Sequence, residues 1–139
     1  MVGAAAIRRT FMLISVIGES MSPTYNTGDR VLIRRGSRSI RRGQVVVVIR
    51  PAGETGWAKS QELEINAMTR TWSIKRVAAI GGDDYPTQVR GQGKVPAGHI
   101  LVIGDDPLSI DSKRHGPCPR NQVIGVLVAR RAKYTTAPT

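Results

Sequence analysis

The stretch Gln44-Val45-Val46-Val47-Val48-Ile49-Arg50 decides the fold class of this chain. All of its apolar residues branch at Cβ, which restricts their side chains in a helix and suits them to the pleated surface of a sheet. Gly43 precedes the run and Pro51 follows it, and both residue types commonly bound strands. The stretch therefore predicts a short strand between two turns.

The same pattern recurs along the chain, because Val and Ile dominate a series of short runs that Gly or Pro separates. The other expected strands are Thr10–Ile17, Arg30–Arg35, Trp72–Ile80, Thr87–Arg90, His99–Ile103 and Gln122–Arg130. We predict an all-β (mainly β) protein, a single compact domain over residues 1–134 with few short helices. One of these helices is expected over Ser22–Asn26.

Two segments do not fit the series of strands. Residues 51–71 lack a clear period, so we expect a mobile insertion between core strands. Trp57 within this insertion is either a packing anchor or a substrate contact. The tail 135–139 is expected to be disordered.

The composition limits the chemistry. A chain of 139 residues can bury a single core. Its one cysteine, Cys118, cannot form an intramolecular disulfide and lies between two prolines, which favours a structural role. The two histidines, His99 and His115, have no further metal-type ligand at a useful spacing. We therefore expect neither a metal nor a cofactor.

The net charge of +11 indicates an anionic partner. Much of this charge comes from eight arginines near the N-terminus: Arg8, Arg9, Arg30, Arg34, Arg35, Arg38, Arg41 and Arg42. A peripheral contact with an anionic membrane is one interpretation, and a solvated hairpin tip without a ligand is the alternative. One Phe, two Trp and three Tyr provide few stacking surfaces, and no nucleic-acid-binding motif is present, so no nucleic acid partner is expected.

The N-terminal apolar runs Val2–Ile7 and Phe11–Ile17 are both shorter than the roughly 20 residues that span a bilayer. We therefore expect no transmembrane helix in this chain. The expected location is cytoplasmic or peripheral to a membrane.

A first candidate for catalysis is the segment Gly18-Glu19-Ser20-Met21-Ser22-Pro23-Thr24, which follows an apolar strand. Gly18 and Pro23 constrain the backbone around Ser20. A nucleophilic hydroxyl beside backbone N–H donors needs such a constraint. A turn that merely ends the strand is the alternative interpretation.

A second candidate is Lys75, in the segment Trp72-Ser73-Ile74-Lys75-Arg76-Val77. On a strand, Lys75 shares a face with small and apolar residues, so its ammonium would be partly desolvated. Desolvation lowers the pKa of a lysine, and a neutral lysine can accept a proton from a serine hydroxyl. A solvated surface lysine is the alternative.

A third segment, Gly104-Asp105-Asp106-Pro107-Leu108-Ser109-Ile110-Asp111-Ser112-Lys113, follows an apolar strand and is rich in Asp, Ser and Pro. By itself it has the composition of an ordinary loop. In this order, the three segments resemble the bacterial type I signal peptidase family, which are serine endopeptidases with a Ser–Lys dyad. The resemblance extends from Ile14 to Arg130 and includes the strands at Gly28–Ile33 and Arg42–Val48.

The resemblance implies a fold of short, coiled antiparallel sheets and a role for individual residues. Ser20 matches the nucleophile, Lys75 the general base, and Ser109 the serine that orients the lysine amine. Asp111 matches the acidic residue that holds the loop through ion pairs, with Arg76 and Lys113 as candidate partners. The backbone N–H of Ser20 would contribute to the oxyanion hole, where some relatives add a hydroxyl at the position of Gly18. The substrate pocket would include Ile14, Val16, Gly18, Met21, Tyr25 and Ile74.

Three features depart from the family pattern. The loop from Gly104 to Ser109 is about one residue shorter, with Asp106 where Asn is common. Lys113 replaces a common Arg, which weakens bidentate pairing with Asp111. Tyr25 stands where an aliphatic residue is typical.

The expected function is therefore removal of a leader, signal or propeptide from a precursor protein or peptide. The chain resembles most the short, anchorless branch that includes maturation proteases for nickel-type superoxide dismutase. Two alternatives stay open: a non-catalytic basic β-domain that binds an anionic partner, and a Ser–Lys relative that cleaves itself. His115 is the rival to Lys75 as a base, although no carboxylate that could orient it is evident.

Overall fold

The valine run forms β3 (Val45–Ile49), an inner strand of a seven-stranded sheet in the computed structural model. The strand order is β1-β2-β7-β3-β4-β5-β6, and all neighbours are antiparallel. The structure describes residues 10–49, 56–57 and 72–131. The expected tail 135–139 and most of the expected insertion 51–71 lie outside these ranges.

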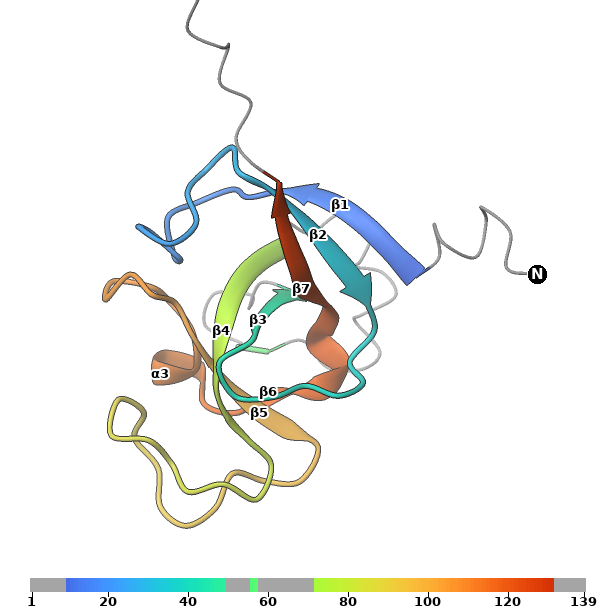
Figure 1. The fold of residues 1–139 in the computed structure, drawn as a ribbon. Helices are drawn as coiled ribbons and strands as arrows, with labels where there is room; N and C mark the ends of the chain where they lie inside the picture. Colours follow the sequence, from blue (N-terminus) through green and yellow to red (C-terminus); the bar gives the residue numbers. More distant parts are fainter. Residues whose placement is uncertain (1–9, 50–55, 58–71, 132–139) are drawn as a thin grey trace, which may run out of the picture.

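The remaining elements are short. Figure 1 shows the sheet curling on itself, with α3 beside the end of β5. The bounds are β1 (Phe11–Ser15), β2 (Arg30–Arg35), β4 (Trp72–Ile80), β5 (His99–Ile103), α3 (Ser112–His115), β6 (Cys118–Pro119), the 3-10 helix η2 (Arg120–Gln122) and β7 (Val123–Arg131). The mainly β fold class is confirmed.

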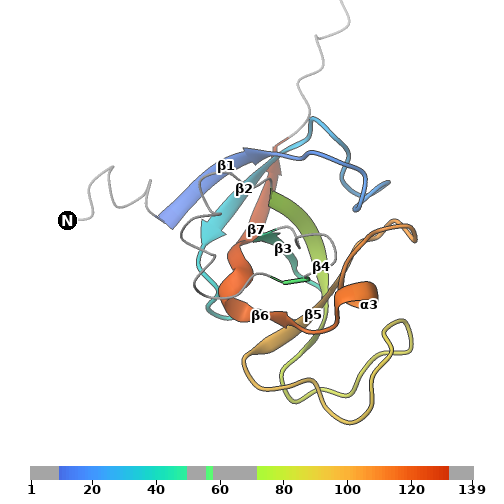
Figure 2. The same cartoon turned by 180° about the vertical axis from the view of Figure 1, so that it is seen from behind.

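β3 separates two parts of the hydrophobic core. Val46 and Val48 pack in a cluster with residues of β4, β5 and β7, whereas Val45 and Val47 pack in a second cluster with residues of β2 and β4. All five residues of β3 are buried. The curl of the sheet covers both faces of this strand, as Figure 2 shows from behind, and this explains why no polar residue interrupts the run.

Most expected strands are confirmed, and those at Arg30–Arg35, Trp72–Ile80 and His99–Ile103 have the expected bounds. The strand expected over Thr87–Arg90 is wrong. Its Val89 is buried, but it lies in a turn in which its N–H donates to the carbonyl of Pro86. Val89 instead anchors a small apolar cluster with Val95, Ala79 and Leu101.

The helix expected over Ser22–Asn26 is also wrong, since this segment forms turns. Pro23 disfavours helical backbone at Ser22 and has no N–H to donate. Among the described residues, the α-helix is α3, which is capped by the side chain of Asp111, an acceptor for the N–H of Lys113. Within the described ranges, no helix is both long enough and apolar enough to cross a membrane.

Candidate functional site

Ser20 lies in the connection between β1 and β2, residues 16–29, here called the Ser20 turn. The base of this turn is closed by two backbone bonds, from Val16 N to Asp29 O (2.8 Å) and from Gly28 N to Val16 O (2.9 Å). The Ser20 hydroxyl donates to the carbonyl of Ile74 at 3.2 Å. Ser20 is thereby held against β4, next to the residue that precedes Lys75.

Lys75 is buried, with 3% of its surface exposed, as its position among small and apolar residues of β4 predicts. Its Nζ donates to the hydroxyl of Ser109 at 2.7 Å. The hydroxyl of Ser109 thus binds the Lys75 amine, and the hydroxyl of Ser20 binds the peptide group that precedes Lys75.

Gly104, at the end of β5, lies where Ser20 and Ser109 meet. A Cβ atom at Gly104 would overlap both the carbonyl oxygen of Ser20 and the side chain of Ser109. The Gly104 N–H donates to Asp111 Oδ2 at 2.8 Å. Two residues further along the loop, the Asp106 N–H donates to the Ser20 carbonyl at 2.9 Å. Only a glycine permits this close approach of three chain segments.

Residues 104–111, here called the site loop, are fixed by Asp111. Its carboxylate is fully buried and accepts from the N–H groups of Gly104 and Lys113. The ammonium of Lys113 lies 3.9 Å from Asp111 Oδ2 and donates to the Pro107 carbonyl at 3.1 Å. Asp111 thus lies beside Lys113, one of its two expected partners.

The other expected partner, Arg76, pairs instead with Asp105. Two bonds of 2.9 Å join the guanidinium to the two carboxylate oxygens, and Thr24 Oγ1 donates to Asp105 Oδ2 at 2.6 Å. The pairing with Asp111 does not form because Asp111 faces the backbone of its own loop. Chiefly through its hydrogen bond, Arg76 lowers the pKa of the Asp105 carboxyl, and Asp105 raises the pKa of Arg76.

Arg130 of β7 holds the returning limb of the Ser20 turn. It donates to the carbonyl of Thr24 at 2.8 Å and to the buried carboxylate of Asp29 at 2.7 Å. Its guanidinium also lies 5.1 Å from the centre of the Tyr25 ring. Thr24 is therefore bound from both sides, by Arg130 through its carbonyl and by Asp105 through its hydroxyl.

The residues expected to line a substrate pocket are close together. Val16, Met21 and Ile74 are buried in one core cluster, and Ile14 and Tyr25 pack against it. With exposed fractions of 5% or less, the three buried residues can shape a pocket floor but offer little surface themselves. The N–H of Gly18 is bound to Thr27 Oγ1 at 3.0 Å.

His115, the rival base, lies in α3 beside Trp57. Its ring packs edge-on against Trp57, with centroids 6.0 Å apart, and Trp57 Nε1 donates to the carbonyl of Gly116 at 3.1 Å. Burial is the main cause of a lowered pKa of His115. Trp57 also packs against a core cluster, so it is a packing anchor in this structure. Burial raises the pKa of the Cys118 thiol, which is consistent with a structural role.

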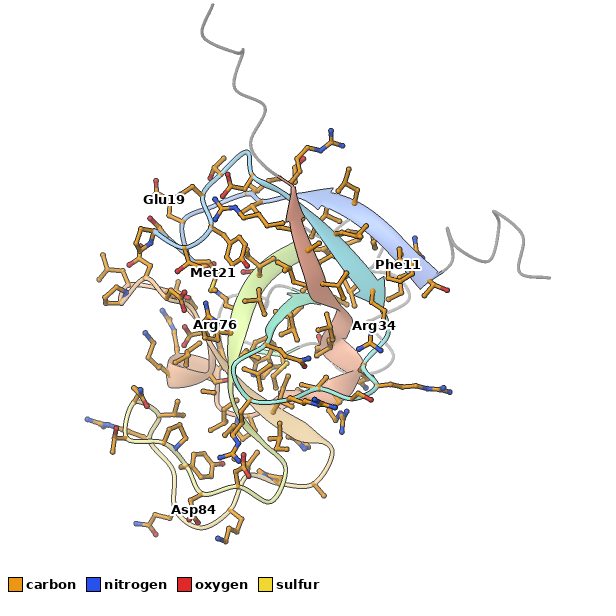
Figure 3. All side chains as sticks on the ribbon, in the orientation of Figure 1. Phe11, Glu19, Met21, Arg34, Arg76 and Asp84 are labelled. Atoms are coloured by element: carbon orange, nitrogen blue, oxygen red, sulfur yellow. The ribbon has the colours of Figure 1, made fainter. Side chains whose placement is uncertain are left out.

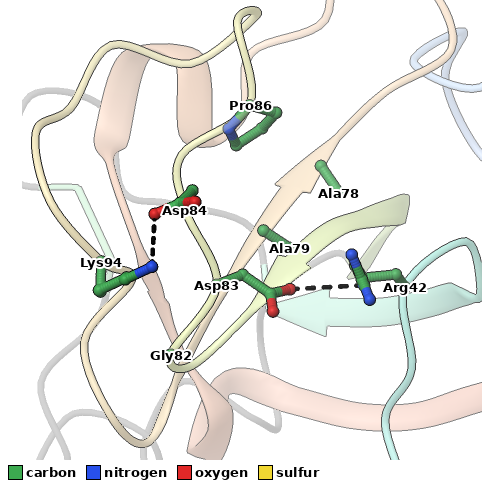
Figure 4. Close-up of a pocket in the computed structure, with 8 residues that line it drawn as sticks. All are labelled: Arg42, Ala78, Ala79, Gly82, Asp83, Asp84, Pro86 and Lys94. Carbon is green, nitrogen blue, oxygen red and sulfur yellow. Dashed lines mark hydrogen bonds and ion pairs between the residues drawn. The ribbon is translucent and has the colours of Figure 1, made fainter.

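A hollow lies near the end of β4, beside Ala78 and Ala79, between the loop 81–98 and Arg42 (Figure 4). Its charged groups pair with one another: Lys94 with Asp84 at 2.7 Å, and Arg42 with Asp83 at 3.5 Å. Among the residues that the structure describes, no group of His, Cys, Asp or Glu side chains could hold a metal ion.

The sequence reasoning missed several residues that shape the site. The Ser20 turn and the site loop are held by the Thr24–Asp105 and Arg130–Asp29 bonds. Gly104 leaves room for the Ser20 carbonyl and the Ser109 side chain. The sequence gives one usable signal, the Gly104-Asp105 pair directly after an apolar strand. Arg130 has no such signal because it lies at the end of a strand among other basic residues.

Comparisons with known proteins identify one family model and similar proteins. The family model described as "Signal peptidase, peptidase S26" matches residues 1–85 and 84–131. A protein named "Signal peptidase I V" from Bacillus subtilis is 29% identical over 140 residues, covering 84% of this chain and 83% of its own length. "Mitochondrial inner membrane protease subunit 2" from Schizosaccharomyces pombe is 28% identical over 125 residues, covering 83% of this chain. The match spans only 61% of that second relative.

Proposed function

This chain belongs to the peptidase S26 signal peptidase family, and on that premise we propose that it is a serine endopeptidase in which Ser20 is the nucleophile and Lys75 the general base. The observation that carries the proposal is the buried Lys75, with its amine 2.7 Å from Ser109 Oγ and its preceding peptide bonded to the Ser20 hydroxyl. A buried lysine among apolar groups favours its neutral form, which is the form that a base requires.

In the proposed reaction, Ser20 Oγ attacks the scissile carbonyl while Lys75 Nζ takes the hydroxyl proton. The protonated amine then gives this proton to the leaving amine, and an acyl-enzyme forms on Ser20. Lys75 next removes a proton from the water that attacks the ester and returns it to Ser20 Oγ as the cleaved acid leaves. Ser109 accepts a hydrogen bond from the amine and so keeps it aimed at Ser20.

The proposed substrates are precursor proteins from which a leader, signal or propeptide is removed. The names of the two relatives, a signal peptidase and an inner membrane protease, support this class of substrate. The finer candidate is a single dedicated precursor of the nickel-type superoxide dismutase kind. Small residues before the scissile bond would suit a floor formed by Val16, Met21 and Ile74.

The test compares Ser20→Ala, Lys75→Met and the double variant in cleavage of a precursor peptide. Each single variant is expected to be inactive and the double variant no worse, since residues that act as one unit have non-additive effects. Ser22→Ala and Lys94→Met are the matched controls, and both are expected to retain most activity, since Lys94 is an exposed lysine of the loop 81–98. Independent, additive losses would contradict the dyad.

Stability supplies a second readout. If Lys75 has a folded-state pKa below its unfolded value of about 10.4, the unfolded chain binds the proton more readily. The site then costs stability below that pH, and the cost grows as the pH falls toward the folded pKa. Lys75→Met should therefore be at least as stable as the wild type near neutral pH. A clearly less stable variant would make Lys75 a structural cation.

A further inference from the structure

A chain of polar contacts, here called the turn clamp, ties the Ser20 turn to the site loop. Its members are Asp29, Arg130, Thr24, Asp105 and Arg76. Arg130 donates to the Asp29 carboxylate and to the Thr24 carbonyl. The Thr24 hydroxyl donates to Asp105, which accepts two bonds from Arg76. The turn clamp therefore runs from β7 through the turn and the loop to β4.

The turn clamp passes next to the groups of the proposed reaction. Thr24 lies four residues after Ser20, in the same turn. Arg76 directly follows Lys75 on β4. Asp105 belongs to the site loop, which also carries the serine that binds the Lys75 amine. The three segments that carry the nucleophile, the base and the orienting serine are thus joined by one set of contacts.

Both ends of the turn clamp are anchored. Asp29 is 2% exposed, and its carboxylate also accepts from a backbone N–H within the turn. At the other end, Arg76 donates to the Gly43 carbonyl at 2.9 Å. Figure 3 shows Arg76 near Met21 of the Ser20 turn, whose sulfur accepts from the Asp105 N–H at 3.4 Å. The ends are therefore fixed, and Thr24 is the member that joins the turn to the loop.

The Thr24 hydroxyl has little to do with stability. Thr24 is exposed, so water could replace Asp105 as its partner, and substitutions at exposed positions usually change stability little. Its bond to Asp105 is nevertheless short, at 2.6 Å, as is typical of a hydroxyl that donates to a carboxylate. Such a bond is directional, and it orients the turn that carries Ser20 at little gain in stability.

We propose that Thr24 is a positioning residue, which sets the place of Ser20 relative to Lys75 by joining the Ser20 turn to the Arg76–Asp105 pair. The inference rests on the proposed function, in which the Ser20 hydroxyl must reach the Lys75 amine. In the described part of the chain, Ser20 is bonded to β4 through the Ile74 carbonyl and to the site loop through a backbone N–H. Without the Thr24 bond the turn can shift on these contacts, and a shift of about 1 Å is costly in an active site.

The first experiment measures cleavage of a precursor peptide by three variants of Thr24. Thr24→Val keeps the shape of the side chain but removes the hydroxyl, so we expect kcat to fall about tenfold or more with KM nearly unchanged. Its thermal midpoint should change by less than about 3 °C. Thr24→Ser keeps the hydroxyl and should retain most of the rate. Thr24→Ala also removes the hydroxyl and gives the same comparison if the valine variant fails to fold.

Thr87→Val is the matched control. It makes the same substitution at an exposed threonine of the loop 81–98 and should change neither kcat nor the thermal midpoint. Equal losses of kcat in Thr24→Val and Thr24→Ser would overturn the proposal, because the hydroxyl would not be the cause. An equal loss in Thr87→Val would overturn it as well.

A second readout does not depend on cleavage. In Ser20→Cys, the rate of alkylation by iodoacetamide against pH gives the pKa of the new thiol, since Cys118 is buried. A thiol beside the Lys75 amine should titrate below the ordinary value of about 8.5, and adding Thr24→Val should return it toward that value. A lowered pKa that Thr24→Val does not change would overturn the positioning role and leave the dyad intact. An ordinary pKa in both backgrounds would contradict the dyad itself, and the positioning role with it.

Discussion

Two loops at opposite ends of β5 are held by different forces. The site loop, residues 104–111, is fixed by polar contacts with distant parts of the chain: Asp105 with Arg76 and Thr24, and Asp106 with the carbonyl of Ser20. The loop 81–98 is fixed mainly by contacts within itself and by a small apolar cluster around Val89 and Val95, with the Arg42–Asp83 pair at 3.5 Å as a longer polar contact. The difference shows where accuracy of position is required, because directional polar contacts fix orientation whereas apolar packing tolerates small shifts.

From this difference between the two loops, we expect the largest loss of cleavage activity from a substitution of Gly104. In Gly104→Ala, the new methyl group would overlap the Ser20 carbonyl and the Ser109 side chain. We expect cleavage to fall at least about a hundredfold, since a displacement of about 1 Å in an active site has a cost of that order. The measurement is kcat/KM, with the thermal midpoint recorded alongside.

Gly93→Ala is its control in the loop 81–98. Gly93 has a positive φ of 79° but open space around it, so the added methyl group meets no atom. We expect a loss of about 1 kcal/mol in stability and unchanged cleavage. Equal losses of activity in the two variants would remove the distinction between the loops.

The second-largest loss, in both stability and kcat, is expected from a substitution of Asp111. Asp111→Asn replaces an oxygen that accepts a backbone N–H with an amide nitrogen, leaving a buried donor without an acceptor. We expect a loss of about 1–3 kcal/mol in the free energy of unfolding and a fall in kcat that exceeds any change in KM. Asp84→Asn, in the exposed pair of the other loop, should change neither quantity. An unaltered kcat in Asp111→Asn would show that the position of Ser109 does not depend on this carboxylate.

A smaller effect concerns pH and the Arg76–Asp105 pair. Because the folded-state pKa of Asp105 lies below its usual value of 3.8, the pair stabilises the protein above that pH. This stabilisation is lost as the pH falls below 3.8 toward the lowered pKa. The gap in urea midpoint between the wild type and Asp105→Asn should therefore shrink from about pH 6 to about pH 2.5. A gap that stays constant would mean that the ion pair contributes nothing.

The smallest effect is expected at Lys94. Its ion pair with Asp84 joins two side chains that are 64% and 80% exposed, and such pairs contribute little. Lys94→Ala should leave both the thermal midpoint and the cleavage rate close to those of the wild type. A pronounced loss of either would give this loop a role that its contacts do not explain.

Much of the fold could be predicted from the sequence, since a run of Val and Ile bounded by Gly and Pro, such as that of β3, leaves a clear pattern. The strand predicted over Thr87–Arg90 was wrong because a buried valine such as Val89 can anchor a turn as well as a strand. The helix α3 was missed because four residues leave no periodic signal. Ser20 and Lys75 were candidates from their own segments and Ser109 from the family resemblance, whereas the partner of Arg76 depends on tertiary geometry that spacing does not reveal. The close approach at Gly104 is likewise a contact between segments far apart in sequence.

Two lysines allow the central claim to be measured directly. Lys75 is buried beside Ser109, while the exposed Lys94 has a raised pKa, chiefly through its hydrogen bond to Asp84. NMR titration of protein with 13C-labelled lysine side chains, assigned with Lys75→Met and Lys94→Ala, gives the pKa of each. The account predicts that Lys75 titrates well below the ordinary value of about 10.4 and below Lys94. A Lys75 that titrates at or above Lys94 would be protonated at working pH, and it could not be the base that activates Ser20.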